Sequence, residues 1–303
     1  MLDATHGSST LADLVPLAVE LCDLKRLRDA SSADSLASRM FRTAWGALEA
    51  GQGVSEVALI TTAAALAAAR LGGIDATVLA DVGLSPQDAT EVLRASFDEV
   101  AGPVDGHLAR QLRGALGQPL HPGKPPAFAE ILIRQPRAGA TCPGKPRFVL
   151  EPPEGHGDHC LVVAVLGFAL APRYGADPAT AFLAGMAHHL HNVALPDSGF
   201  VGEVLLGRHL GPILARLFAR ELATLPAGLR ACTEAALATI PDADTPGGRA
   251  FHAADVIDRV LQMRHYDQVA RFTIDQALDD MELVHTGPTQ AFHHAVLQEA
   301  GLP

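Results

Sequence analysis

The stretch CLVVAVLGFALAP, residues 160–172, is the longest apolar run in the chain. It is shorter than the roughly 20 residues that a membrane-spanning helix needs, and it suits a helix at the centre of a hydrophobic core. Leu and Ala dominate the chain, whereas β-branched and aromatic residues are sparse, which favours helix. We therefore expect an all-α protein with this segment at its centre.

Amphipathic or Ala-rich segments lie on both sides of this run and predict further helices. A Pro- and Gly-rich stretch with two short runs, AEILIR and RFVLE, predicts a β-hairpin-like connector between them. Asp158 is placed to cap the central helix, which we expect from His159 to about Tyr174. The predicted parts are an N-terminal helical region (1–116), the connector (117–157) and a helical domain (158–303).

Bulk properties narrow the class of protein. The formal net charge is −11 over 303 residues, with no run of Lys or Arg longer than two, so we do not expect nucleic acid as a partner. The four cysteines are far apart, no signal peptide or membrane span is evident, and we expect a soluble cytoplasmic protein. The Ala-rich segment 54–71 predicts a packing helix, either within the N-terminal region or across a homodimer.

Histidines gather at the end of the apolar segment AFLAGMAHHLHNVALPDSGF, residues 181–200. We expect this helix to open at Asp177-Pro178 and to end before Pro196. The candidate metal ligands fall on four separate predicted helices: His159, the pair His188 and His189, His209 and Asp255. Imidazole and carboxylate together suit a divalent transition metal such as Fe, Mn, Co, Ni or Zn. His191 shares a helical face with His188 and is an alternative to His189.

Four segments, in this order, resemble the HD-domain superfamily of metal-dependent phosphohydrolases. DHCLVVA (158–164) is similar to its opening H-S-x-x-V-A, and AGMAHHLHNVALPDS (184–198) to its central AALLHDIGKxxxPDS. GEVLLGRHLGPIL (202–214) is similar to the Glu–His segment that follows in the HD-GYP branch. FHAADVIDRV (251–260) matches the final ADxxD helix. The resemblance implies an HD-like helical bundle over about residues 150–265.

The resemblance also implies a ligand set of His159, His188, His189 and Asp255, with His209 added in two-metal branches. Position 189 carries His where the family carries Asp, and a neutral imidazole has one free nitrogen and cannot bridge two ions. We therefore expect one ion rather than two. Helical periodicity favours Asp258 as the buried carboxylate, whereas the resemblance favours Asp255 as the ligand, with Asp258 as orienting support.

The expected chemistry is hydrolysis of a phosphate ester, on a nucleotide or another small phosphorylated compound, by metal-activated water. Asp197 is the candidate for orienting water or substrate, and Arg173, Arg208 and Arg249 are candidates for binding phosphate. Two alternatives stay open. One is an HD-type regulatory or scaffolding module that has lost catalysis, and the other is an HD-type iron oxygenase.

Overall fold

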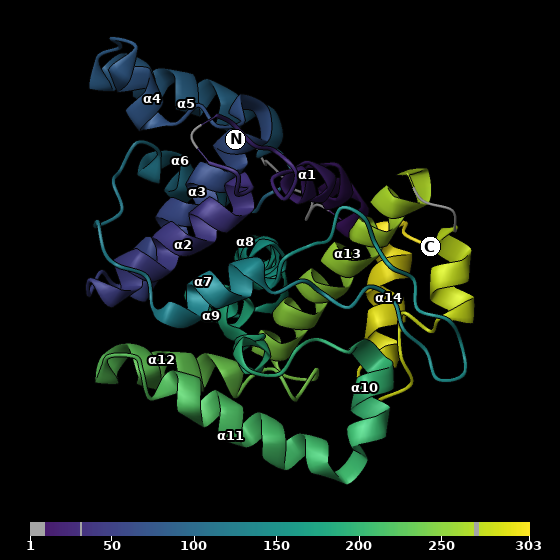
Figure 1. Cartoon of the computed structure of the whole chain (residues 1–303). Coiled ribbons are helices and arrows are strands. Elements are labelled where there is room, and N and C mark those ends of the chain that lie inside the picture. Colours follow the sequence, from purple (N-terminus) through teal and green to yellow (C-terminus); the bar gives the residue numbers. More distant parts are fainter. Residues whose placement is uncertain (1–9, 31, 270–272) are drawn as a thin grey trace.

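The computed structural model describes residues 10–30, 32–269 and 273–303, and every named element in these ranges is helical (Figure 1). The all-α prediction is confirmed. The first half holds α1 (Leu11–Asp23), α2 (Leu36–Glu49), α3 (Val54–Leu71), α4 (Ala76–Asp81), α5 (Pro86–Val100), α6 (Gly106–Ala115) and α7 (Ala127–Arg134). The second half holds α8 (His156–Tyr174), α9 (Pro178–Ala187), η1 (Leu190–Val193), α10 (Gly199–Leu206), η2 (Gly207–His209), α11 (Leu210–Leu222), α12 (Ala227–Leu237), α13 (Pro246–Val269), η3 (Gln276–Asp280) and α14 (Gln290–Ala300).

Helix α8 is the central element, as the apolar run predicts. Every residue from His156 to Ala171 is buried. A helix that is apolar on all sides has to be covered on all sides, and α8 packs against α2, α7, α9 and α13. Figure 1 shows it near the middle of the molecule, with the N-terminal helices on one side and α13 on the other.

The contact between α8 and α9 depends on a glycine. A Cβ atom at Gly185 of α9 would lie 2.5 Å from the Cα of Ala164 in α8, so only a residue without a side chain allows this approach. Because His159 lies in α8 and His188 directly follows α9, the same close approach brings these two histidines together.

Helix α9 ends earlier than expected. It stops at Ala187, His188 forms its C-cap, and the separate turn η1 follows. The side chain of Asn192 donates to the backbone carbonyl of Leu195 at 3.1 Å, and local bonds between a side chain and the backbone compete with continued α-helix. The break turns the three histidines away from a single helical face.

The connector departs from the hairpin prediction. AEILIR lies in helix α7, because Phe128, Ala129 and Leu132 fall on one helical face and are buried there. The remainder contributes isolated bridges, Pro136 with Gly155 and Ala140 with Phe148, and forms no ladder among the described residues. Phe128 packs edge-on against Trp45 of α2, with ring centroids 4.9 Å apart, which ties α7 to the N-terminal helices.

The central helix also begins earlier than predicted. It starts at His156 with Gly155 as its N-cap, so Asp158 lies within the first turn and does not cap it. The Asp158 carboxylate instead accepts hydrogen bonds from the hydroxyls of Ser35 and Ser38 at the start of α2. The core is continuous across positions 116 and 157, and buried residues of all three predicted parts belong to it.

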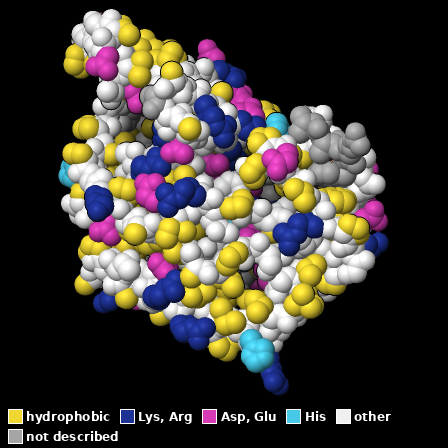
Figure 2. All heavy atoms as spheres, viewed as in Figure 1, with side chains coloured by type: hydrophobic (Ala, Val, Ile, Leu, Met, Phe, Trp, Pro, Cys, Tyr) yellow, Lys and Arg dark blue, Asp and Glu magenta, His cyan; other side chains and the backbone are white. Residues whose placement is uncertain are grey.

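Helix α3 packs within the chain, against α2, α5, α6, α8 and α9. Of the described helices it is the one that is long and apolar enough to cross a membrane by length and composition. Since 56% of it is buried inside the protein, it is typical of a core helix. Figure 2 shows basic and acidic side chains interspersed over the visible face of the molecule.

We predict that Gly185→Ala lowers the free energy of unfolding by about 1–3 kcal/mol, because the added methyl group meets backbone atoms of α8. Gly114→Ala in α6 is the matched control, since nothing lies within 4 Å of the position that its methyl group would take and helix propensity favours Ala by roughly 0.5–1 kcal/mol. Urea denaturation of both variants is the measurement. Equal stability of the two variants would contradict the prediction.

Candidate metal centre

Three imidazoles meet where α8 passes the end of α9. His159 lies in α8, His188 is the C-cap of α9, and His189 is the next residue. Each offers a ring nitrogen, and these atoms lie within 4.8 Å of one another. The Nε2 atoms of His159 and His188 are 3.1 Å apart. The structure thus brings together three of the predicted ligands.

The Nδ1 atoms of the first two rings are held by acceptors. Nδ1 of His159 lies 2.7 Å from the carboxylate of Asp258, and Nδ1 of His188 lies 2.8 Å from the carbonyl of Gly185. A carboxylate and a carbonyl only accept, so each Nδ1 carries the hydrogen and donates it. In the neutral rings the lone pairs are therefore on the Nε2 atoms.

His189 is held in the same way. Its Nδ1 lies 2.7 Å from Oδ1 of Asn192, whose Nδ2 donates to the carbonyl of Leu195 at 3.1 Å. The bond to Leu195 identifies Oδ1 as the acceptor, so Nδ1 of His189 donates. Metal-ligating histidines are commonly oriented by such a bond on the other ring nitrogen.

The Nε2 atoms of His159 and His188 lie close enough to share a proton or to bind one cation. Two lone pairs cannot face each other at 3.1 Å unless a proton on one ring or a cation lies between them. Burial, followed by the neighbouring imidazole of His159, holds the pKa of His188 well below its ordinary value. Burial, followed by His188, does the same to the pKa of His189. Neutral buried imidazoles of this kind fit a divalent transition metal.

Asp255 adds a carboxylate to this group. Its Oδ1 lies 3.3 Å from Nε2 of His159, and its Oδ2 lies 3.6 Å from the guanidinium of Arg259. Burial opposes ionisation, but the contacts with His159 and Arg259 outweigh it and hold the pKa of Asp255 well below its ordinary value. Asp255 is half-buried whereas Asp258 is completely buried, as the helical periodicity predicts for Asp258.

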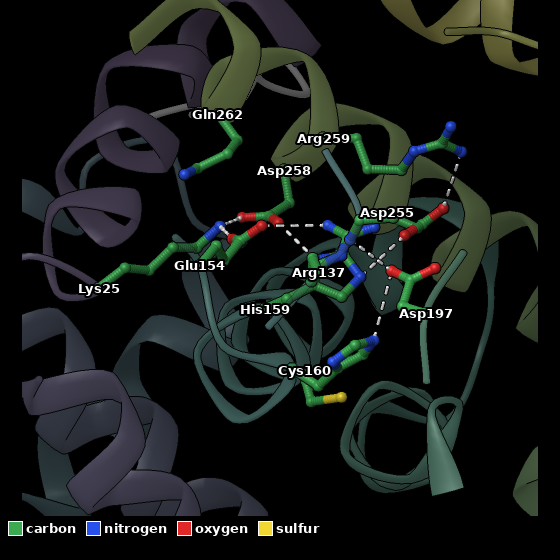
Figure 3. A network of polar contacts seen from close by, with 12 residues as sticks. Lys25, Arg137, Glu154, His159, Cys160, Asp197, Asp255, Asp258, Arg259 and Gln262 are labelled. Carbon is green, nitrogen blue, oxygen red and sulfur yellow. Dashed lines mark hydrogen bonds and ion pairs between the residues drawn. The ribbon is translucent and has the colours of Figure 1, made fainter. Parts of the chain in front are cut away.

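A buried network of charges supports His159 from behind (Figure 3). Nζ of Lys25 lies 2.5 Å from Oε1 of Glu154 and 2.5 Å from Oδ1 of Asp258. Arg137 contacts the other oxygen of Glu154 at 3.2 Å. The pKa of Lys25 is raised: burial favours the neutral amine, but the two carboxylates outweigh it. The carboxylate of Asp258 therefore contacts both the ammonium group of Lys25 and the imidazole of His159.

The structure places Asp197 and His191 beside the cluster. Asp197 accepts hydrogen bonds from the backbone amides of Ala138 at 2.9 Å and Gly199 at 2.8 Å. Its pKa is held well below the ordinary value, because contacts with His156, Arg137 and these amides outweigh burial. The ring of His191 lies 5.6 Å from that of His189, and in the described chain His189, not His191, shares the ligand group with His159.

Other predicted residues lie elsewhere. His209 and Arg208 are exposed in η2, and neither lines the cavity described below. Arg249 is exposed and lies over the ring of Phe292, 5.8 Å from its centroid. Arg173 pairs with Glu299. Nothing in the sequence around these residues indicates that they lie far from the histidine cluster.

A cavity of about 690 Å³ opens beside the ligand group. His188, His189 and Asp255 line one part of it, together with Arg137 and Arg259. Lys25, Glu154 and Arg137 were missed by the sequence analysis, because they belong to a loop and the connector, where no periodicity marks a buried charge. No sequence signal marks Lys25, which lies in the charged segment ELCDLKRLRD, residues 20–29.

Comparison with known proteins returned no match: no family model, no curated protein and no solved structure is significantly similar to this chain.

We predict that Lys25→Met lowers the free energy of unfolding by about 3–5 kcal/mol, because it removes the ammonium group that the buried carboxylates of Glu154 and Asp258 share. Lys145→Met, at an exposed lysine, is the control and should change stability by less than about 0.5 kcal/mol. Chemical denaturation measures both. A small and equal effect of the two substitutions would show that the network does not hold the fold.

We also predict that the metal-free protein loses stability as the pH falls from about 7 to 4. Burial lowers the pKa of His191 to about 4 and holds those of His188 and His189 well below the ordinary 6.5. At a pH between the lowered pKa of the folded chain and the ordinary pKa of the unfolded chain, these histidines bind protons in the unfolded chain but not in the folded one. Denaturation in the presence of a chelator should show a slope of at least about 1 kcal/mol per pH unit.

The control for this pH dependence is His191→Gln, which removes one titrating ring and should make the slope shallower. Constant or rising stability between pH 7 and 5 would contradict the assignment of neutral imidazoles.

Proposed function

We propose that this chain is a metal-dependent hydrolase of phosphate esters. The carrying observation is the convergence of one buried and two half-buried imidazoles, His159, His188 and His189, each with its Nδ1 hydrogen-bonded, beside the ionised carboxylate of Asp255 at a cavity. In this proposal His159, His188, His189 and Asp255 hold one divalent transition metal such as Fe, Mn, Co, Ni or Zn. The ordered resemblance to the HD superfamily supports the same residues and an HD-like bundle.

Two features support one ion rather than two. His189 stands where the family places a bridging carboxylate, and a neutral imidazole cannot bridge. A second group that could hold an ion is formed by Glu154, His159 and Asp258. However, the ammonium group of Lys25 already lies 2.5 Å from both of its carboxylates. Lys25 therefore supplies the cation at this second group.

A bound divalent ion would supply a Lewis acid for the phosphoryl group and lower the pKa of a bound water. Arg137 and Arg259 line the cavity and take the place of Arg208 and Arg249 as candidates for binding phosphate oxygens. Guanidinium groups bind phosphate oxygens through charge-assisted hydrogen bonds, which suits both residues for this role.

Asp197 keeps a positioning role in this proposal. Because its pKa is held well below the ordinary value, it is ionised at neutral pH and is a weak base. Its two oxygens accept hydrogen bonds from backbone amides, and they can accept further hydrogen bonds from a water molecule. In the reaction, a water oxygen bonds to phosphorus as the P–O bond to the alcohol breaks. The proton goes to the leaving alcohol, and inorganic phosphate is released.

The proposal predicts about one transition-metal ion per chain in protein purified without chelator, measured by elemental analysis. His188→Gln and Asp255→Asn should each weaken metal binding by at least about 10-fold, because each removes a ligand. His209→Gln is the matched control and should keep the metal, since His209 is exposed and lies outside the cavity lining.

Activity is measured on a panel of phosphate esters with and without chelator. Turnover that chelation abolishes and metal restores supports hydrolysis. Metal binding without turnover on any ester would favour the regulatory alternative, and an iron-specific optical signal with oxygen consumption would favour the oxygenase. A protein that binds no metal, with His188→Gln behaving as wild type, would overturn the metal centre itself.

A further inference from the structure

The cavity beside the metal centre is divided into a polar part and an apolar part. The polar part carries the histidines, Asp255 and the two arginines. The rest of the lining comes mainly from α11, α12, α13 and the segment before α14, and its side chains are largely apolar. The residues that matter here are Leu214, Phe218, Leu222, Leu237, Phe251 and Leu283.

The apolar wall adjoins the ligands directly. The ring of Phe251 lies 5.1 Å from that of His188, and the ring of Phe218 lies 5.2 Å from that of His191. A molecule bound through the metal centre would therefore meet apolar surface immediately beyond its charged group.

Helix α11 presents an apolar stripe to the cavity. Leu214, Phe218 and Leu222 follow one another at intervals of four residues, so they lie on one face of the helix. Leu222 is buried, but Leu214 and Phe218 are only half-buried although the stripe faces inward. Apolar side chains that line about 690 Å³ of space instead of packing together are typical of a ligand pocket.

The charges of the lining limit the charge of the ligand. The lining contains two arginines, Arg137 and Arg259. It also contains more carboxylates than arginines: Glu154, Asp197, Glu203, Glu234 and Asp255. Arg137 contacts Glu154 of the charge network behind His159, and Arg259 contacts Asp255. Glu203 and Glu234 come from α10 and α12 and would repel a second phosphate group. The site therefore suits one phosphate close to the metal and disfavours polyphosphates.

We propose that the substrate is a phosphomonoester with an apolar body, such as an alkyl or aryl group, and not a nucleoside polyphosphate. This inference rests on the proposed function. The phosphate binds at the metal centre with Arg137 and Arg259, and the apolar body lies along Leu214 and Phe218 of α11. A cavity of this size can enclose a body of drug-like dimensions.

The test that does not depend on turnover is calorimetric binding of alkyl phosphonates, which carry the same anionic group and are not hydrolysed. The series runs from methyl- to decylphosphonate, with metal-loaded full-length protein. Affinity should rise by up to about fourfold for each added methylene, from the free energy of burying a CH₂ group, and the heat-capacity change should become more negative. Affinity that does not depend on chain length, or tighter binding of a nucleoside triphosphate, would overturn the inference.

Two variants locate the apolar body. Leu214→Asn places an amide in the stripe and should flatten the dependence of affinity on chain length. Leu205→Asn is the matched control, because Leu205 is 80% exposed in α10 and does not line the cavity. Equal chain-length dependence in both variants would show that the apolar body does not lie along α11.

The same alkyl series, as phosphate esters, separates the two proposals. Hydrolysis with kcat/KM that rises with chain length supports both. Hydrolysis that prefers nucleoside triphosphates or ignores chain length overturns the inference and leaves the proposed function. Chain-length-dependent phosphonate binding without hydrolysis of any ester overturns the proposed function and leaves the ligand class.

Discussion

Burial of α8 on every side requires neighbours on every side, and this constraint arranges the rest of the molecule. Helices from both halves of the chain, among them α2, α9 and α13, pack against it and share one continuous core. A close contact between Gly185 and Ala164 sets the separation of α8 and α9. The histidines at the start of α8 and the end of α9 are therefore positioned by core packing and not by a flexible loop.

The first turn of α8 carries polar groups into this apolar environment. Buried polar groups are costly unless they are hydrogen-bonded, and each partner comes from a distant part of the chain. Ser35 and Ser38 bond Asp158, and Asp258 bonds His159. Lys25 neutralises the carboxylates behind them. The N-terminal region is thus part of the candidate centre, whose charges would be unbalanced without it.

The two ends of the cavity serve different purposes in the proposed chemistry. At one end, anchored imidazoles and an ionised carboxylate concentrate donor atoms, and two arginines offset part of the negative charge. At the other end, half-buried apolar side chains of α11 face open space. Acidic groups outnumber basic ones in the lining, so a bound cation would be needed to hold an anionic substrate there.

The sequence by itself determined the helical class, the central position of residues 160–172 and the grouping of His159, His188 and Asp255 as candidate ligands. Apolar periodicity reports local burial, which is why it also identified Asp258 as the buried carboxylate. Only the tertiary structure decided which side chains contact these buried charged and polar residues. Lys25 and Glu154 are separated by 129 residues, and His159 and Asp258 by 99. Such pairings depend on how helices pack, which no local pattern encodes, and packing likewise made AEILIR a helix and left His209 outside the cavity lining.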